Sequence, residues 1–428
     1  MDAFLIRGPS RLAGTVPVSG AKNAALPALA AALLTAQPVG LESVPAVADI
    51  RTMQKLLTGM GVSVALSPGG GVSLSAHDVR STEAPYDLVR TMRASILVLG
   101  PLLSRFGEAW VSLPGGCAIG VRPVDLHVKA FEAMGARVAV EKGYIHAHVS
   151  RVGTLAGRLQ GTTIRFPTVT VTGTENVLLA ATLARGTTRI QNAALEPEVV
   201  DLARLLRSMG ASISGEGTST VVVEGVERLS GTGSAPHVVV PDRIEAGTYL
   251  AAGALTAGDV TVAGARASDL PAFLSALAAA GASVEETESG VRVRRDGPLR
   301  PVDLATGPHP GFPTDLQAQF MALMTQAEGT SRIAETIFEN RFLHAVELVR
   351  LGAGIDVEGH TATVHGPSRL QGAPVTASDL RASAALVLAG LVAEGETLVR
   401  RIYHLDRGYS GMEGKLTALG AGVERVSG

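Results

Sequence analysis

The sequence predicts an α/β fold in which six repeated units form two halves and enclose apolar helices. Three observations predict it. A helix–glycine–strand corner occurs six times, and each unit also contains a strongly apolar helix. A loop rich in Gly, Ser and Pro, GTGSAPH (231–237), then divides the repeats into three and three.

The corners recur at nearly constant spacing. They are LLTGMGVSV (56–64), FEAMGARVAV (131–140), LLRSMGASIS (205–214), LAAAGASVEE (277–286), LVRLGAGIDV (348–357) and LTALGAGVER (416–425). The glycines that end the helices, Gly61, Gly135, Gly210, Gly281, Gly352 and Gly420, follow one another at intervals of 68 to 75 residues. A glycine at this position, followed by alternating apolar residues, is typical of a helix that ends and turns into a strand.

The second helix of each unit is apolar on nearly every face, as in NAALPALAAALL (23–34) and LRASAALVLAGLVA (380–393). Such a helix belongs inside a core. Its polar residues gather at the N-terminal end: Lys22, Asn23, Arg93, Glu175, Asn176, Asp242, Arg243, Asp315, Asp379 and Arg381. Helix N-termini attract anions, so this pattern favours an anionic ligand.

Composition limits the class of protein. The net charge of −2 argues against a nucleic-acid partner, which would need a basic face. A single cysteine among 428 residues cannot close an intramolecular disulfide and indicates a reducing compartment. The apolar run 24–34 is shorter than the roughly 20 residues that span a bilayer. We therefore expect a soluble, cytoplasmic protein without a membrane partner.

Cys117 lies in LPGGCAIGVRPVD (113–125), after two glycines and five residues before Arg122. A thiol near a guanidinium and helix ends can have its pKa lowered from about 8.5 toward neutrality, which suits proton transfer or covalent bonding. A free cysteine can equally be a small buried hydrophobic residue. The glycines, the arginine and the isolation of this thiol favour a functional role.

The charged residues have alternative interpretations. Lys22 could extend its ammonium group to solvent, and Asp315 could simply cap the helix that follows it. The recurrence of Arg93, Arg381 and Arg407 at helix starts and repeat loops favours a shared carboxylate or phosphate ligand. No HExxH or CxxC pattern is present, so no metal or other cofactor is expected.

Nine motifs along the chain resemble the UDP-N-acetylglucosamine 1-carboxyvinyltransferase family of enolpyruvyl transferases. They are GAKNAALP (20–27), MRASI (92–96), PGGCAIGVRPVDLH (114–127), TVTGTENVL (170–178), PDRIEAGT (241–248), GFPTDLQAQ (311–319), IFENRF (337–342), DLRASAALV (379–387) and HLDRGY (404–409). The resemblance implies an inside-out α/β barrel of two domains, 22–235 and a discontinuous one of 1–21 and 236–428. It also implies transfer of enolpyruvate from phosphoenolpyruvate to the 3′-hydroxyl of UDP-N-acetylglucosamine, the first committed step of peptidoglycan synthesis.

The resemblance further implies roles for individual residues. Cys117, Asp315, Lys22 and Arg407 would be catalytic, with Asp315 accepting the proton of the sugar hydroxyl and Cys117 reacting with the epoxide fosfomycin. Substrate binding would use Lys22, Asn23, Arg93, Arg122, Pro123, Val124, Asp125, Leu126, Thr170, Asp315, Ile337, Asp379, Arg381 and Arg407. Two alternatives are an enolpyruvyl transferase acting on shikimate 3-phosphate and a catalytically silent paralogue that only binds the nucleotide sugar. The context of Cys117 argues against the first, and the joint presence of Cys117, Lys22 and Asp315 argues against the second.

Overall fold

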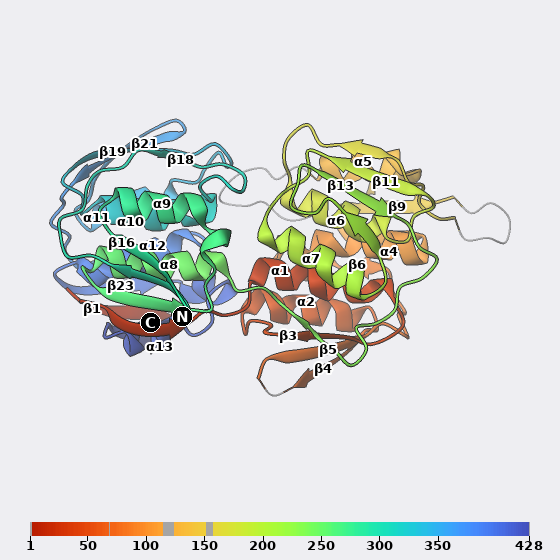
Figure 1. Ribbon diagram of the computed structural model, residues 1–428, viewed down its shortest axis with the longest axis horizontal. Helices are drawn as coiled ribbons and strands as arrows, with labels where there is room; N and C mark the ends of the chain where they lie inside the picture. The colour runs from red at the N-terminus through yellow and green to blue at the C-terminus, as the bar shows by residue number, and fades with distance from the viewer. Residues whose placement is uncertain (1, 68, 114–123, 151–156, 428) are drawn as a thin grey trace. The chain divides into compact units, whose positions relative to one another are not determined.

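The computed structural model describes residues 2–67, 69–113, 124–150 and 157–427, and its ribbon is drawn in Figure 1. The described residues form two compact units. One contains residues 2–19 and 241–427, and the other contains the described residues between 20 and 240. Each unit has its own hydrophobic core. The glycine- and proline-containing segment 231–237 leads into strand β14 (His237–Val238), and the chain leaves the 20–240 unit after Val240.

The described residues of the 20–240 unit form three four-stranded sheets with the orders β14-β3-β5-β4, β6-β7-β9-β8 and β10-β11-β13-β12. Their strands are β3 (Val39–Glu42), β4 (Ser63–Ser67), β5 (Gly71–Ser75), β6 (Glu83–Ala84), β7 (Glu108–Ser112), β8 (Ala136–Glu141), β9 (Tyr144–Val149), β10 (Thr163–Arg165), β11 (Thr187–Gln191), β12 (Ser212–Ser214), β13 (Thr220–Glu224) and β14.

The described residues of the other unit also form three four-stranded sheets, β16-β17-β15-β2, β18-β19-β21-β20 and β22-β23-β1-β24. Their strands are β1 (Asp2–Gly8), β2 (Ala13–Pro17), β15 (Asp259–Ala263), β16 (Ser283–Thr287), β17 (Gly290–Arg294), β18 (Leu304–Ala305), β19 (Gly329–Ala334), β20 (Gly354–Glu358), β21 (Thr361–Gly366), β22 (Pro374–Thr376), β23 (Gly395–Arg400) and β24 (Gly422–Ser427).

All six sheets follow one pairing pattern. The first two strands in each order, or the last two where β2 ends the order, are parallel, and the other neighbours are antiparallel. The N-terminal strands complete sheets of the C-terminal unit, because β1 pairs with β23 and β24, and β2 pairs with β15. The repeat predicted from sequence is therefore a four-stranded mixed sheet with its two helices.

Each unit encloses apolar helices. In the 20–240 unit these are α1 (Lys22–Ala31) with η1 (Ala32–Leu34), η2 (Arg93–Val98) with α4 (Leu99–Phe106), and α6 (Val171–Ala181). In the other unit they are α8 (Arg243–Leu255), η4 (Thr314–Leu316) with α10 (Gln317–Met324), and α12 (Ala382–Val392), and these three helices pack against one another. The remaining helices are α2 (Ala48–Gly59), α3 (Tyr86–Val89), α5 (Asp125–Ala133), α7 (Pro197–Ser208), η3 (Ala267–Asp269), α9 (Pro271–Ala279), α11 (Leu343–Arg350), η5 (Ile402–Arg407) and α13 (Met412–Ala418).

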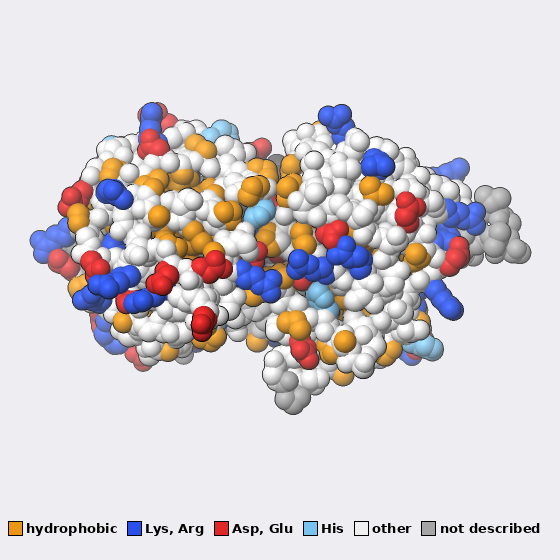
Figure 2. All heavy atoms as spheres, viewed as in Figure 1, with side chains coloured by type: hydrophobic (Ala, Val, Ile, Leu, Met, Phe, Trp, Pro, Cys, Tyr) orange, Lys and Arg blue, Asp and Glu red, His pale blue; other side chains and the backbone are white. Residues whose placement is uncertain are grey.

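The apolar helices are stable because they are buried rather than because they are amphipathic. Residues 382–391 of α12 are all buried. Full burial of a Leu or Val side chain contributes roughly 1.5–3 kcal/mol, so an all-apolar helix gains most when it is enclosed on every side. At the surface, Figure 2 shows basic and acidic side chains interspersed over the face in view, in keeping with the net charge of −2.

The glycine corners have the geometry that the sequence predicts. The six glycines after α2, α5, α7, α9, α11 and α13 all have positive φ angles, between 88° and 101°. Residues other than glycine rarely adopt this left-handed conformation. The recurring glycine therefore ends each amphipathic helix and turns the chain into the next strand.

Candidate active site

The predicted residues of the 20–240 unit lie at the starts of helices. Lys22 and Asn23 begin α1, Arg93 begins η2, and Thr170 is the N-cap of α6. Val124 precedes α5, which begins with Asp125 and Leu126. The helices that carry these residues pack together, because α1 and α6 both contact η2, and α5 contacts α6. Cys117, Arg122 and Pro123 lie outside the described residues.

Lys22 does not extend to solvent. Lys22 is only 9% exposed, and its Nζ lies 3.4 Å from Oδ2 of Asp49 in the first turn of α2. A buried ammonium group is costly unless a carboxylate compensates it, and Asp49 supplies that partner. Sequence reasoning missed Asp49, because nothing in the chain links it to a lysine 27 residues away.

Asn176 in α6 connects this helix to three other helical segments of the same unit, η2, α4 and α5. Its Nδ2 donates to the carbonyl of Ile96 at 2.8 Å, and its Oδ1 accepts from the amide of Gly100 at 2.8 Å. Nδ2 also lies 3.1 Å from Nδ1 of His127, in α5. Burial lowers the pKa of His127 to about 4, so its imidazole is neutral and Nδ1 can accept this hydrogen bond. The segments that carry Arg93 and Asp125 are thereby tied to α6.

Three of the predicted residues of the other unit, Asp315, Asp379 and Arg381, lie near helix starts. Asp315 is in η4, Asp379 and Arg381 precede α12, Ile337 follows β19, and Arg407 ends η5. Asp379 caps α12, because its Oδ1 accepts from the amides of Arg381 at 2.9 Å and Ala382 at 3.0 Å.

Asp315 interacts with two arginines and does not cap α10, which has no side-chain cap hydrogen bond. Nη2 of Arg341 donates to Oδ1 of Asp315 at 2.7 Å, and Nε of Arg381 lies 3.5 Å from Oδ2. Arg341 is 4% exposed, whereas the side chain of Asp315 is 27% exposed. The carboxylate is thus held by buried cations and still reachable from solvent. Arg341 was missed by sequence reasoning, although it lies in the motif IFENRF.

Arg381 is a buried guanidinium placed between anions and an aromatic ring. Its Nη2 lies 3.9 Å from Oδ2 of Asp242, and its Cζ lies 5.1 Å from the ring centre of Tyr409. Burial alone would lower the pKa of Arg381, but Tyr409, Asp242 and Asp315 raise it above its usual value. Apart from these ion pairs and the interaction with Tyr409, Nε, Nη1 and Nη2 have no close hydrogen-bond partner within the described residues. Because buried donors are normally hydrogen-bonded, this charged fork is suited to an anionic ligand.

Two neighbouring histidines contribute no positive charge at neutral pH. Burial lowers the pKa of His344 to about 4, against an opposing effect of Asp379. Burial, with the charges of Arg401 and Arg407, also lowers the pKa of His404 to about 4. The arginines beside these histidines, in contrast, stay charged across the physiological range.

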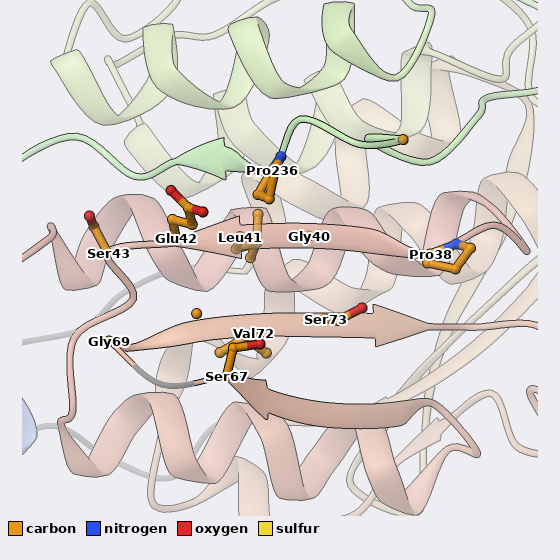
Figure 3. A pocket seen from close by; sticks show the side chains of 12 residues that line it. Pro38, Gly40, Leu41, Glu42, Ser43, Ser67, Gly69, Val72, Ser73 and Pro236 are labelled. Atoms are coloured by element: carbon orange, nitrogen blue, oxygen red, sulfur yellow. The ribbon is translucent and has the colours of Figure 1, made fainter.

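A pocket of about 330 Å³ in the 20–240 unit lies elsewhere. Figure 3 shows that Leu41, Glu42 and Ser43 approach it from β3 and its end, and Val72 and Ser73 from β5. None of the predicted site residues that the structure describes lines it. Among the described residues, no helix is long and apolar enough to cross a membrane, and no group of His, Cys, Asp or Glu is arranged to hold a metal ion.

Comparison with known proteins is consistent over the whole chain. Residues 6–416 match the family model of EPSP synthase (3-phosphoshikimate 1-carboxyvinyltransferase). UDP-N-acetylglucosamine 1-carboxyvinyltransferases of Cereibacter sphaeroides and Magnetococcus marinus are 57% and 55% identical, with complete coverage of both chains. The enolpyruvyl transferase NikO from Streptomyces tendae has a TM-score of 0.86 at 27% identity, covering 100% of this chain and 99% of its own. EPSP synthase from Acinetobacter baumannii, at 18% identity with complete coverage of both chains and a TM-score of 0.76, shares the fold.

Proposed function

Because the chain belongs to the UDP-N-acetylglucosamine 1-carboxyvinyltransferase family, we propose that it transfers enolpyruvate from phosphoenolpyruvate to the 3′-hydroxyl of UDP-N-acetylglucosamine and releases phosphate. The observation that carries the choice of acceptor is 57% identity over the full length of relatives with that name. We also propose that this reaction serves peptidoglycan synthesis in the cytoplasm.

The reaction proceeds by addition and elimination. The sugar hydroxyl loses its proton as its oxygen bonds to C2 of phosphoenolpyruvate, while a proton is added to C3. The tetrahedral adduct then loses a proton from C3, the bond from C2 to the phosphate oxygen breaks, and phosphate leaves. Both steps need an acid, a base and a cationic surrounding for phosphate and carboxylate.

The residues of this chain are assigned to these tasks. Asp315 accepts the hydroxyl proton, and its contacts with Arg341 and Arg381 fix the direction of its carboxylate. Arg381 binds an anionic group of phosphoenolpyruvate through donors that have no close hydrogen-bond partner among the described residues. Lys22, Asn23, Arg93, Arg122 and Arg407 supply further donors, and Cys117 protonates C3.

The acceptor binds through a set of residues that shares Arg122 with the donor site. Arg122, Pro123, Val124, Asp125, Leu126, Thr170, Ile337 and Asp379 are assigned to the nucleotide sugar. The hydroxyl of Thr170 and Oδ1 of Asp379 accept hydrogen bonds from helix-start amides, so these atoms contribute by fixing the starts of α6 and α12.

One assay tests the proposal. Phosphate release from phosphoenolpyruvate is measured with UDP-N-acetylglucosamine or with shikimate 3-phosphate as the acceptor. Release with the nucleotide sugar and background release with shikimate 3-phosphate is the expected result. The opposite preference would assign the chain to the acceptor named in the matching family model. Release with neither acceptor, from folded protein, would favour a protein that only binds the nucleotide sugar.

A further inference from the structure

Glu335 is a buried carboxylate at the end of β19 that the proposed mechanism does not use. It is 1% exposed. Its Oε1 accepts from the hydroxyl of Thr306 at 3.0 Å and from the amides of Ile337 at 2.9 Å and Phe338 at 3.1 Å. Its Oε2 accepts from the hydroxyl of Thr314 at 2.9 Å. A buried carboxylate is tolerated when such donors compensate it, and multiple bonds of this kind hold it rigidly.

The bond to Oε2 fixes the turn that carries the proposed base. Thr314 immediately precedes Asp315 in η4. Arg341, which follows the Ile337 turn in the chain, also binds this segment. Its Nη2 donates to Oδ1 of Asp315 at 2.7 Å and to the carbonyl of Thr314 at 3.3 Å. Residues 314–315 are therefore held at one end by Glu335 and at the other by Arg341.

The bonds to Oε1 fix the turn that carries Ile337. Two consecutive amides of this turn, those of Ile337 and Phe338, point at one oxygen atom. Thr306 supports the same turn twice, because its Oγ1 accepts from the amide of Thr336 at 2.9 Å and its carbonyl accepts from the hydroxyl of Thr336 at 2.7 Å. The proposed sugar-binding turn is thereby built around Oε1.

We propose that Glu335 is a positioning residue that sets Asp315 and the Ile337 turn in register with each other. This inference rests on the proposed function. Glu335 is too buried to touch a substrate, so it acts through the two turns. Small displacements of a reacting group are costly: about 1 Å can reduce the rate roughly 10²-fold. One carboxylate that bonds both turns keeps the base and the bound sugar hydroxyl at a constant separation.

The two oxygens can be tested separately with a matched pair of variants. Thr314→Val and Thr306→Val each remove one hydroxyl donor to Glu335 and keep the side-chain shape. Thr314→Val frees the Asp315 turn, so we expect kcat to fall about tenfold with little change in KM for the nucleotide sugar. Thr306→Val removes one donor to Oε1 and also the hydroxyl that accepts from the amide of Thr336, so it loosens the Ile337 turn and we expect the main change in KM. A purely structural Glu335 would lower the melting temperature in both variants and leave both constants unchanged per folded molecule.

Replacement of Glu335 itself completes the test. Glu335→Ala leaves the donors of both turns unpaired, and kcat/KM should fall about 10²-fold or more. Glu335→Gln should restore activity to within about tenfold of the wild type. Its oxygen can accept the three Oε1 bonds, and its amide can donate to Thr314, whose hydroxyl can turn into an acceptor.

The controls separate this inference from the proposed function. A wild-type protein that releases no phosphate with UDP-N-acetylglucosamine contradicts the proposed function. An active wild type whose Thr314→Val and Thr306→Val variants both keep its kcat and KM contradicts the role of Glu335. If Glu335→Ala does not fold, the two threonine variants still give a decisive result, because each is a milder change. Thr314→Val removes the donor to Oε2 only, and Thr306→Val leaves Oε1 with its two amide donors.

Discussion

Two buried threonines allow a quantitative test of how much an unpaired hydroxyl group costs the hydrophobic core. Thr188 in β11 and Thr397 in β23 are both 0% exposed, and within the described residues neither hydroxyl has a hydrogen-bond partner. Both lie two residues after a glycine, at corresponding places of two repeats. The repeat that contains β15 has Val260 at this place, also 0% exposed. The fold therefore already accommodates valine there.

Replacing either threonine by valine should stabilise the protein. An unpaired hydroxyl in an apolar core costs roughly 1–3 kcal/mol by mutational measurements, and valine fills the same volume with a methyl group. We expect each substitution to raise the free energy of unfolding by about 1 kcal/mol. For a unit of about 200 residues this corresponds to an increase of roughly 2–4 °C in the melting temperature.

Matched controls make the sign of the effect informative. Thr35 and Thr256 are also buried, at 3% and 6% exposed, and their hydroxyls are used: Thr35 donates to the carbonyl of Leu229 at 2.9 Å, and Thr256 accepts from the amide of Leu12 at 3.2 Å. Thr35→Val and Thr256→Val should lower the melting temperature, because each leaves a partner unpaired.

The measurement is thermal or urea unfolding of the full chain, followed by circular dichroism. Because Thr188 and Thr397 lie in different units, their effects should be additive in the double variant. If Thr188→Val and Thr397→Val destabilise as much as the controls, the hydroxyls are hydrogen-bonded in solution and the reasoning is wrong.

Three further predictions concern groups that titrate or react. Burial, followed by the charges of Glu198 and Glu196, raises the pKa of Glu175 well above its usual 4.5, so its contribution to stability is complete below pH 4.5 and is lost as pH rises through the folded-state pKa. Glu175→Gln has no proton to lose, so its melting temperature relative to the wild type should increase with pH above 4.5; a constant difference would contradict this. Cys117→Ser should reduce turnover by roughly 10²–10⁴-fold, and Cys117→Asp should keep much of it while resisting fosfomycin, as phosphate-release assays would show. Asp315→Ala should lose turnover on the same scale and keep fosfomycin labelling of Cys117, measured by mass spectrometry; full activity would remove its role as base.

The repeat architecture could be predicted from sequence because its signals are local. A glycine after an amphipathic helix ends that helix within one turn of the chain, and a helix that is apolar on every face is predicted to be buried. Not every enclosed helix is one continuous α-helix, because the apolar segment after Met92 forms η2 followed by α4. Here Asn176 binds the carbonyl of Ile96 and the amide of Gly100, and so contacts both segments from α6.

The candidate site could be predicted only in part, because sequence signals are local and contacts between distant residues are not. Asp315 and Arg381 stand at helix starts, where the sequence pattern draws attention to polar residues. Their supporting partners carry no such local signal. Arg341 reaches Asp315 across 26 residues, and Glu335 reaches Thr314 across 21. Such pairs depend on which elements become neighbours, and no local pattern in a single sequence reports that.

The symmetry of the repeats explains why one end of the 241–427 unit collects so much charge. Its three enclosed helices α8, α10 and α12 pack against one another, and each begins near a charged residue: Asp242, Asp315 and Arg381. Equivalent positions of packed repeats meet at the same end, so Arg381 comes within 3.9 Å of Asp242 and 3.5 Å of Asp315. Close packing makes this possible: a Cβ at Gly247 in α8 would lie 2.4 Å from Leu316, next to Asp315. Two carboxylates around one guanidinium tolerate burial better than any of the three groups alone, while the donors of Arg381, which lack close hydrogen-bond partners among the described residues, remain suited to an anion. The repeat that builds the core therefore also assembles the charges that the proposed chemistry needs.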